Sequence, residues 1–220
     1  MNYNFEIDII HYKKLKERKL AIHNELKDKN IIYNFIEKYD RDTLSHNDLK
    51  KFENDINNAY KANFLSHILS YENLLKSNKQ YKLILEDDSI PKPIFYKNIN
   101  KYLKHLSVNF DLFYISDGKR KFKLPIYKKL PFKYVYKKQN KFTSWGGHGA
   151  SKFADAYFIS RKCAEILTKQ FYQKNYVVNT SIDWWKNEMI SKYNLNVYWG
   201  EPTLVSTNLF ETSLPVNYRN

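Results

Sequence analysis

The chain has 220 residues, which is enough for one hydrophobic core and short for two, so a single domain over residues 1–220 is expected. Hydrophobic residues make up 43% of the sequence and aromatic residues 17%, which excludes a disordered, solvated chain. The formal net charge of +14 predicts an anionic partner, such as nucleic acid, a membrane surface or a phosphorylated substrate.

The single cysteine, Cys163, excludes an internal disulfide framework and a cysteine-rich zinc module, and it suits a reducing compartment. The first ten residues lack the charged and apolar regions of a signal peptide, and no run of about 18 apolar residues occurs. We therefore expect a cytoplasmic protein that is soluble or at most peripheral to a membrane.

Predicted strands and helices alternate along the chain. In the first half, strands are expected at residues 5–10, 31–36, 82–85 and 111–116, and helices from residue 13, at 58–75 and at 98–106. In the second half, strands are expected at 156–160 and 196–199, and helices at 161–171 and 182–193. Residues 40–48 are polar enough for a loop. This order predicts an α/β fold with a parallel or mixed sheet flanked by helices.

Residues 118–154 have an unusual composition, with eleven lysine or arginine residues, no acidic residue and many interleaved aromatic side chains. The segment is too long for an ordinary connection, which indicates a functional or disordered segment. We expect a basic, aromatic flap on the acceptor side of an active site, whose lysines are free to meet phosphate groups of an acceptor or an anionic membrane. The same pattern also fits single-stranded nucleic acid or a solvated basic face.

Three consecutive carboxylates, Glu86, Asp87 and Asp88, directly follow the apolar strand at 82–85. Open α/β sheets bind ligands at the carboxyl ends of their strands, so a site is expected there. Oxygen ligands in close succession suit Mn²⁺ or Mg²⁺, which in a nucleotide-sugar enzyme would neutralise the departing diphosphate. The alternative is an acidic cap between a strand and a loop.

Several motifs occur in a characteristic order: Arg18 after the first strand, then residues 62–67, 83–88, 111–115, 156–160 and 162–164. Together they resemble glycosyltransferase family 25, the lipopolysaccharide-type and procollagen-type galactosyltransferases. The resemblance covers roughly residues 7–205. Its most specific parts are the Ser66-His67 dipeptide and the Leu-Ile-Leu-Glu-Asp-Asp run that ends at Asp88.

The resemblance implies a GT-A-like fold and metal-dependent transfer of a hexose from a UDP-sugar, with UDP-galactose the first expected donor and UDP-glucose the second. The acidic triplet takes the place of the family's Asp-x-Asp motif, which makes Glu86 and Asp88 the expected ligands of Mn²⁺ or Mg²⁺. Arg18 and Asp87 are expected near the donor. The acceptor would be a glycan, a glycolipid or a protein-linked sugar.

The chain also departs from the family pattern at three places. His11 stands where the family usually has Asn, and Ala62 stands where it often has Gly. Ala154-Asp155 replaces a common Thr-His pair, which leaves the third metal ligand open.

Asp183 lies where the family carries a late acidic residue. Inverting transfer needs a carboxylate that takes the proton of the acceptor hydroxyl, and Trp184 beside it could stack on a pyranose. The alternative is a helix N-cap with two indoles buried behind it. Glu188 and Asp155 are the competing candidates for the base.

Two histidines are further candidates. His67 lies on the apolar helix at 58–75, so it is either a core histidine or, by its family position, a donor-side residue. Trp145 and His148 lie among three glycines in residues 145–149, which suits either an acceptor-binding loop or a surface turn. We expect a UDP-sugar and an acceptor as partners rather than nucleic acid. The rival function is a nucleic-acid-binding module that uses residues 118–154, and it leaves the acidic triplet unexplained.

Overall fold

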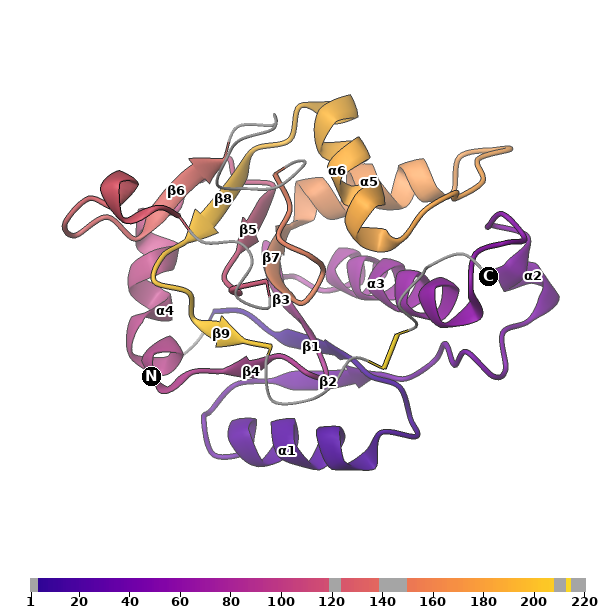
Figure 1. The fold of residues 1–220 in the computed structure, drawn as a ribbon, viewed down its shortest axis with the longest axis horizontal. Helices are drawn as coiled ribbons and strands as arrows, with labels where there is room; N and C mark the ends of the chain where they lie inside the picture. Colours follow the sequence, from indigo (N-terminus) through magenta and orange to yellow (C-terminus); the bar gives the residue numbers. More distant parts are fainter. Residues whose placement is uncertain (1–3, 119–123, 139–149, 208–212, 215–220) are drawn as a thin grey trace.

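A seven-stranded mixed sheet forms the centre of the computed structural model, which describes residues 4–118, 124–138, 150–207 and 213–214 (Figure 1). In sheet order, its strands are β2 (Tyr33–Ile36), β1 (Ile7–Ile10), β3 (Tyr81–Glu86), β7 (Ala156–Ser160), β5 (Leu112–Tyr114), β8 (Val197–Gly200) and β6 (Val135–Lys138). Only β7 and β6 run against the other five. The expected sheet, mixed and mostly parallel, is confirmed.

Helices cover both faces of this sheet (Figure 1). The helices are α1 (Lys16–Leu26), α2 (His46–Leu49), α3 (Asn58–Lys76), α4 (Pro93–His105), α5 (Arg161–Phe171) and α6 (Ile182–Tyr193). Strand β3 shows the layering, because Leu83 and Leu85 pack into one core with α1 and α4, while Ile84 packs into the other with α3, α5 and α6. Side chains that alternate along a strand point to opposite faces, so two cores form. No helix in the described ranges is long and apolar enough to cross a membrane.

Local sequence signals explain where the helices differ from expectation. Helix α4 begins at Pro93, five residues before the predicted start, because proline suits the first turn of a helix. The short helix α2 overlaps the end of the segment expected to be a loop, and it begins with a capping box in which the side chains of Ser45 and Asp48 accept from each other's backbone N–H groups. A small second sheet, β4 (Ile90–Pro91) with β9 (Val205–Ser206), was not predicted.

The segment 118–154 differs from the expected flap. The structure describes Gly118, residues 124–138 and residues 150–154 of it. Residues 135–138 form β6, an edge strand antiparallel to β8, and a short 3₁₀ turn, η1 (Ile126–Lys128), precedes it. The high density of lysines hid this strand from the hydrophobic pattern.

The expectation that the lysines of this segment are free to meet phosphate is wrong for some of them. Lys129 Nζ lies 3.3 Å from Glu201, and the fully buried Lys152 also lies 3.3 Å from Glu201. Lys138 is buried over the ring of Trp199. Glu201, the acidic partner of Lys129 and Lys152, lies outside the segment and far from it in sequence, so the sequence did not reveal these pairs.

Candidate active site

The ends of three neighbouring strands meet at one edge of the sheet. Strands β1 and β3 are parallel, so their carboxyl ends lie side by side, and the backbone N–H of Asp87 donates to the carbonyl of Ile10 at 3.0 Å. Strand β7 runs the opposite way and begins at this edge, where the carbonyl of Asp155 accepts from the N–H of Glu86 at 2.9 Å. The topology therefore brings the acidic triplet and Asp155 together.

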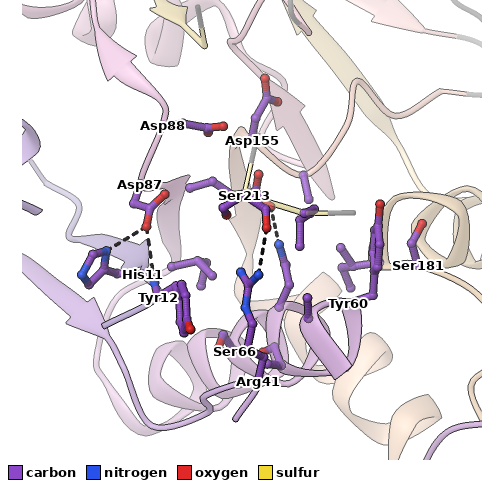
Figure 2. A pocket seen from close by; sticks show the side chains of 18 of the residues that line it. His11, Tyr12, Arg41, Tyr60, Ser66, Asp87, Asp88, Asp155, Ser181 and Ser213 are labelled. Atoms are coloured by element: carbon purple, nitrogen blue, oxygen red, sulfur yellow. Dashed lines mark hydrogen bonds and ion pairs between the residues drawn. The ribbon is translucent and has the colours of Figure 1, made fainter. Parts of the chain in front are cut away.

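These residues line a cleft of about 280 Å³ (Figure 2). Five carboxylates face it, and so do two arginines and three tyrosines. They are Glu86, Asp87, Asp88, Asp155, Asp183, Arg18, Arg41, Tyr12, Tyr39 and Tyr60. The volume is near the lower end for small-molecule sites, about 300–1,000 Å³. A cleft with this excess of carboxylates favours a cationic ligand or an anionic ligand that arrives with a metal ion.

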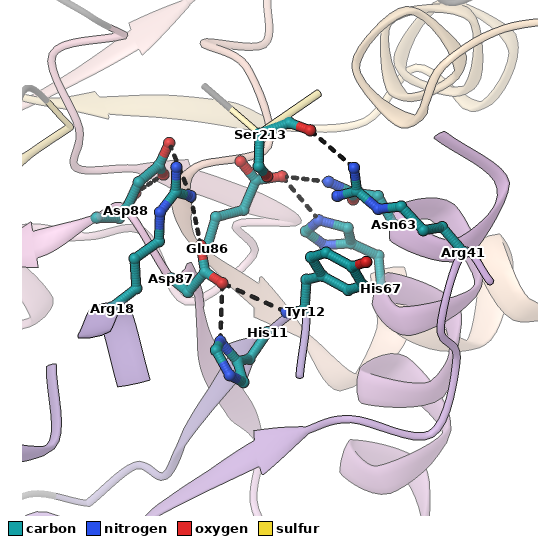
Figure 3. A network of polar contacts seen from close by, with 11 residues as sticks. His11, Tyr12, Arg18, Arg41, Asn63, His67, Glu86, Asp87, Asp88 and Ser213 are labelled. Carbon is teal, nitrogen blue, oxygen red and sulfur yellow. Dashed lines mark hydrogen bonds and ion pairs between the residues drawn. The ribbon is translucent and has the colours of Figure 1, made fainter. Parts of the chain in front are cut away.

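Asp87 is fully engaged with the protein (Figure 3). Its carboxylate accepts from His11 Nδ1 at 2.8 Å, from the backbone N–H of Tyr12 at 3.3 Å and from Arg18 Nη1 at 2.8 Å. Arg18 Nη1 also lies 4.0 Å from Asp88 Oδ2. Asp87 therefore holds Arg18 at the cleft, and His11, a departure from the family pattern, is one of its partners.

Glu86 is held from the other side by α3. Its Oε1 accepts from Asn63 Nδ2 at 2.9 Å and lies 3.5 Å from His67 Nε2 (Figure 3). Burial by itself would raise the pKa of Glu86, but the contacts with His67 and Asn63 and the ammonium of Lys186 hold it below the ordinary value. Glu86 is therefore ionised at neutral pH.

A chain of hydrogen bonds continues from Glu86 into the core. His67 Nδ1 lies 2.9 Å from the hydroxyl of Tyr157, which lies 2.7 Å from the hydroxyl of Tyr71. Burial lowers the pKa of His67, so its imidazole is neutral and carries one N–H. Because a carboxylate only accepts, this proton lies on Nε2 and Tyr157 donates to Nδ1. His67 thus acts from behind Glu86 and does not line the cleft.

Asp155 is only partly compensated by the protein. Its Oδ1 accepts from Ser116 Oγ at 2.7 Å and from the N–H of Ala156 at 3.0 Å, while its buried Oδ2 has no hydrogen-bond partner. Burial raises the pKa of this carboxyl to about 8, and Glu86, Asp183 and Asp88 add to the rise. Such a group is a candidate functional residue because it is costly to keep in place.

Lys186 supplies a buried ammonium beside these carboxylates. Its Nζ donates to the carbonyl of Phe153 at 3.1 Å and lies 3.9 Å from the ring centre of Tyr157. Burial lowers its pKa to about 8, against the opposing effect of Asp183, Glu86 and Asp155. Lys186 was not among the residues expected from the sequence, although a lysine four residues from both Ile182 and Ile190 lies on the buried stripe of α6.

The first turn of α6 brings Asp183 to the cleft. The N-cap of this helix is Ser181, so Asp183 is not the cap residue that the alternative interpretation required. Trp185 is buried and donates to the hydroxyl of Tyr176 at 2.8 Å, whereas Trp184 is half exposed and does not line the cleft. Glu188 is exposed and also lies outside the cleft lining, which leaves Asp155 as the competing candidate for the base.

Two expected residues cannot be placed, and one unexpected arginine lies at the cleft. Trp145 and His148 lie outside the described residues. Arg41, which the sequence analysis did not single out, packs its guanidinium 4.1 Å from the ring centre of Tyr12 and donates to the carbonyl of Ser213 at 2.8 Å. The arginine thereby joins a residue near the carboxyl end of the chain to the cleft (Figure 2).

The site has the donor types for a hard cation but no complete preformed cage. Within the described ranges, no group of three or more His, Cys, Asp or Glu side chains is arranged to hold a metal ion. Mg²⁺ commonly takes one or two carboxylates and completes its shell with water and substrate phosphates. The orphaned Oδ2 of Asp155 and the carboxylate of Asp88 fit that mode of binding.

A family model decides the identity of the chain. The model described as "Glycosyltransferase family 25 (LPS biosynthesis protein)" matches residues 5–183, which is most of the sequence. The chain belongs to glycosyltransferase family 25. It is therefore a glycosyltransferase, and the family resemblance seen in its motifs is confirmed.

A solved glycosyltransferase structure supports the fold of this family 25 protein. A glycosyltransferase involved in the glycosylation of the major capsid of PBCV-1 matches with a TM-score of 0.53 at 10% identity, over 94% of both chains. The inositol-1-phosphate CTP transferase from T. maritima matches with a TM-score of 0.41 at 9% identity, over 94% of this chain and 90% of that one. No curated protein sequence matches the chain significantly.

Asp155→Asn should stabilise the protein progressively as the pH rises. Between the ordinary carboxyl pKa of 3.8 and the folded value of about 8, the folded protein holds a proton that the unfolded chain has released, so stability falls as the pH rises through this window. Asparagine has no such charge to bury. We expect the variant to melt close to the parent at pH 5 and at least a few degrees higher at pH 8.5, measured by scanning calorimetry.

The matched control is Asp28→Asn, an exposed carboxylate after α1, which should show no such trend. Equal melting temperatures of parent and Asp155→Asn at every pH would show that Asp155 carries no burial penalty.

Proposed function

We propose that this glycosyltransferase moves a hexose from a UDP-sugar to an acceptor hydroxyl with inversion, assisted by Mn²⁺ or Mg²⁺. The observation that carries the proposal is the cleft at the carboxyl ends of β1 and β3, where five carboxylates and two arginines meet. A nucleoside diphosphate with a divalent cation satisfies both charges at once. Membership of the family adds the activated sugar.

Asp88 and Asp155 would hold the cation. Both line the cleft, and a cation would supply the partner that Asp155 Oδ2 lacks. Glu86, the other expected ligand, has one oxygen occupied by Asn63 and His67 and adds its negative charge from beside them. When bound, the ion supplies Lewis-acid stabilisation of the departing diphosphate.

The chain's own cations would orient the donor. Arg18 is locked by Asp87 at 2.8 Å, so its guanidinium needs little further ordering when it meets a phosphate. Arg41 lies at the same cleft, stacked on Tyr12. Fixed positive groups of this kind position an anionic substrate and stabilise the charge that develops on the leaving group.

Asp183 is the proposed general base. It lies at the cleft in the first turn of α6, which fixes the position of its carboxylate relative to the other cleft residues. Asp155 is the less available base, because its pKa, raised to about 8 by burial, leaves it mostly protonated at neutral pH in the absence of a cation. Asp183 would accept the proton of the acceptor hydroxyl as that oxygen attacks the anomeric carbon.

A screen of donor hydrolysis tests the proposal most directly. We expect UDP-galactose first and UDP-glucose second to be cleaved in the presence of Mn²⁺, with little cleavage of GDP- and CMP-sugars and none after chelation. The acceptor class, glycan, glycolipid or protein-linked sugar, can then be tested with the cleaved donor. Hydrolysis of no donor, together with tight and salt-sensitive binding of oligonucleotides, would favour the nucleic-acid-binding alternative instead.

Asp88→Asn should fold normally but lose metal-dependent binding of UDP. The change removes a negative charge at nearly constant volume from a residue that would hold the proposed cation. Calorimetric titration of UDP with and without Mn²⁺ measures the effect, and Asp28→Asn again serves as the control. Equal UDP affinity of Asp88→Asn and parent in Mn²⁺ would mean that the acidic triplet only caps the strand.

Asp183→Asn should lower kcat by about 10²–10⁴-fold, the usual contribution of a general base, while donor affinity stays near that of the parent. Glu188→Gln on the same helix is the matched control, since it lies outside the cleft lining. A lower melting temperature with little change in rate would indicate that Asp183 has a structural role and would move the assignment to Asp155.

A further inference from the structure

An exposed apolar loop projects from the edge of the sheet that carries β6 (Figure 1). Every residue from 126 to 133 is exposed, in the sequence Ile-Tyr-Lys-Lys-Leu-Pro-Phe-Lys. Its four large apolar side chains, those of Ile126, Tyr127, Leu130 and Phe132, are each between 58% and 87% exposed. We call residues 126–133 the apolar loop. Several large apolar side chains exposed within one short loop indicate a binding site.

Lysines alternate with these apolar side chains. Lys128, Lys129 and Lys133 lie within the loop, and Lys137 is exposed on the adjoining strand. No acidic residue occurs anywhere in residues 118–154, so every charged residue of the loop is a lysine, although Lys129 is paired with Glu201 from outside the segment. The loop therefore presents apolar and cationic groups on the same surface.

The loop is built into the fold rather than loosely attached. The hydroxyl of Tyr136, a buried residue of β6, accepts from the N–H of Leu130 at 3.0 Å and donates to the carbonyl of Lys133 at 3.1 Å. At the other end, Glu201 accepts from the N–H of Leu124 and pairs with Lys129. Because β6 is also paired with β8, the apolar side chains are held outward by the sheet itself.

The apolar loop is separate from the active site. Strands β6 and β2 are the two opposite edges of the sheet, and none of residues 124–138 lines the carboxylate cleft at the ends of β1 and β3. The apolar loop therefore contacts neither the proposed donor site nor the proposed base. Its exposed apolar groups need another explanation.

We propose that the apolar loop docks the protein on an anionic membrane surface, with its apolar side chains in the interface and its lysines on lipid phosphate groups. Stable peripheral binding takes two signals, and this loop supplies both apolar insertion and positive charge. Tyrosine suits the level of the headgroups, where its ring is buried and its hydroxyl stays hydrated. A second copy of the chain fits less well, because it would bring the same lysines and a net charge of +14 against one another.

Co-sedimentation with vesicles tests this proposal. We expect the parent to bind vesicles of equal phosphatidylcholine and phosphatidylglycerol and to bind pure phosphatidylcholine much more weakly. The variant Ile126→Ser/Tyr127→Ser/Phe132→Ser should lose at least tenfold in partitioning. Lys128→Gln/Lys133→Gln should lose roughly fivefold for each lysine removed, on anionic vesicles only.

Matched control variants lie on and near α1, which packs far from β6. Leu20→Ser/Ile32→Ser removes two apolar side chains that are 60% and 62% exposed, and Lys16→Gln/Lys27→Gln removes two exposed lysines. Neither should change vesicle binding if the loop is the docking surface. All four variants alter exposed side chains, so melting temperatures near that of the parent are expected and exclude unfolding as the cause of any loss.

A labelled cysteine gives a second measurement. Cys163, the one native cysteine, is fully buried, so a thiol dye should react selectively with Leu130→Cys or with the control Leu20→Cys. An environment-sensitive dye at position 130 should shift to the blue on anionic vesicles, and the same dye at position 20 should not. The proposal is overturned if the parent ignores anionic vesicles, if the loop variants bind as well as the parent, or if the loop instead proves to be a dimer interface in solution.

Discussion

Removing a carboxylate from water costs several kcal/mol unless cations or hydrogen bonds compensate, and this protein brings five carboxylates to one cleft. Neighbouring cationic and hydrogen-bonding side chains offset part of that cost. Arg18 and His11 balance Asp87, Asn63 and His67 balance Glu86, and Lys186 places an ammonium behind the group. Residues of three helices, α1, α3 and α6, and one residue at the end of β1 therefore stabilise negative charge at this end of the sheet.

The carboxylates differ in how many protein partners they have, and this difference indicates different roles. Asp87 has three protein partners and acts as a structural anchor for Arg18. Asp155 has a buried oxygen without a partner and a pKa raised to about 8, so it is destabilising as it stands. Natural proteins retain such residues where function requires them, because a ligand or cation can supply the missing interaction.

The surface near β1 and β3 differs in chemistry from the surface near β6, at one edge of the sheet. Near β1 and β3 the surface is concave and acidic, which suits a metal-assisted nucleotide donor. Beyond β6 it is exposed, apolar and basic, and Glu201 pairs there with the exposed Lys129 and the buried Lys152. None of residues 124–138 lines the cleft, so a membrane bound at the β6 edge would not contact the described cleft residues through this loop.

The sequence by itself determined the helices and strands of the sheet core, since hydrophobic period and β-branched runs are local properties, and it placed the acidic triplet at a strand end. The motif order also identified the family. Boundaries that depend on caps, as at Pro93 and Ser45, were missed because a few side-chain contacts decide them. Residues 135–138 were missed as a strand because pairing with β8, rather than their own composition, holds them.

Only the tertiary structure decided how the charged groups are partnered. Lys152 and Glu201 are 49 residues apart, and Arg18 and Asp87 are 69 apart, so no sequence pattern relates them. The antiparallel insertion of β7 brings Asp155 beside Glu86, and the buried stripe of α6 turns Lys186 toward both. Burial and distance set the energy of a charge, and both are properties of the folded chain. For that reason the sequence could supply the candidate carboxylates, while the fold alone distinguished the compensated Asp87 from the partly compensated Asp155.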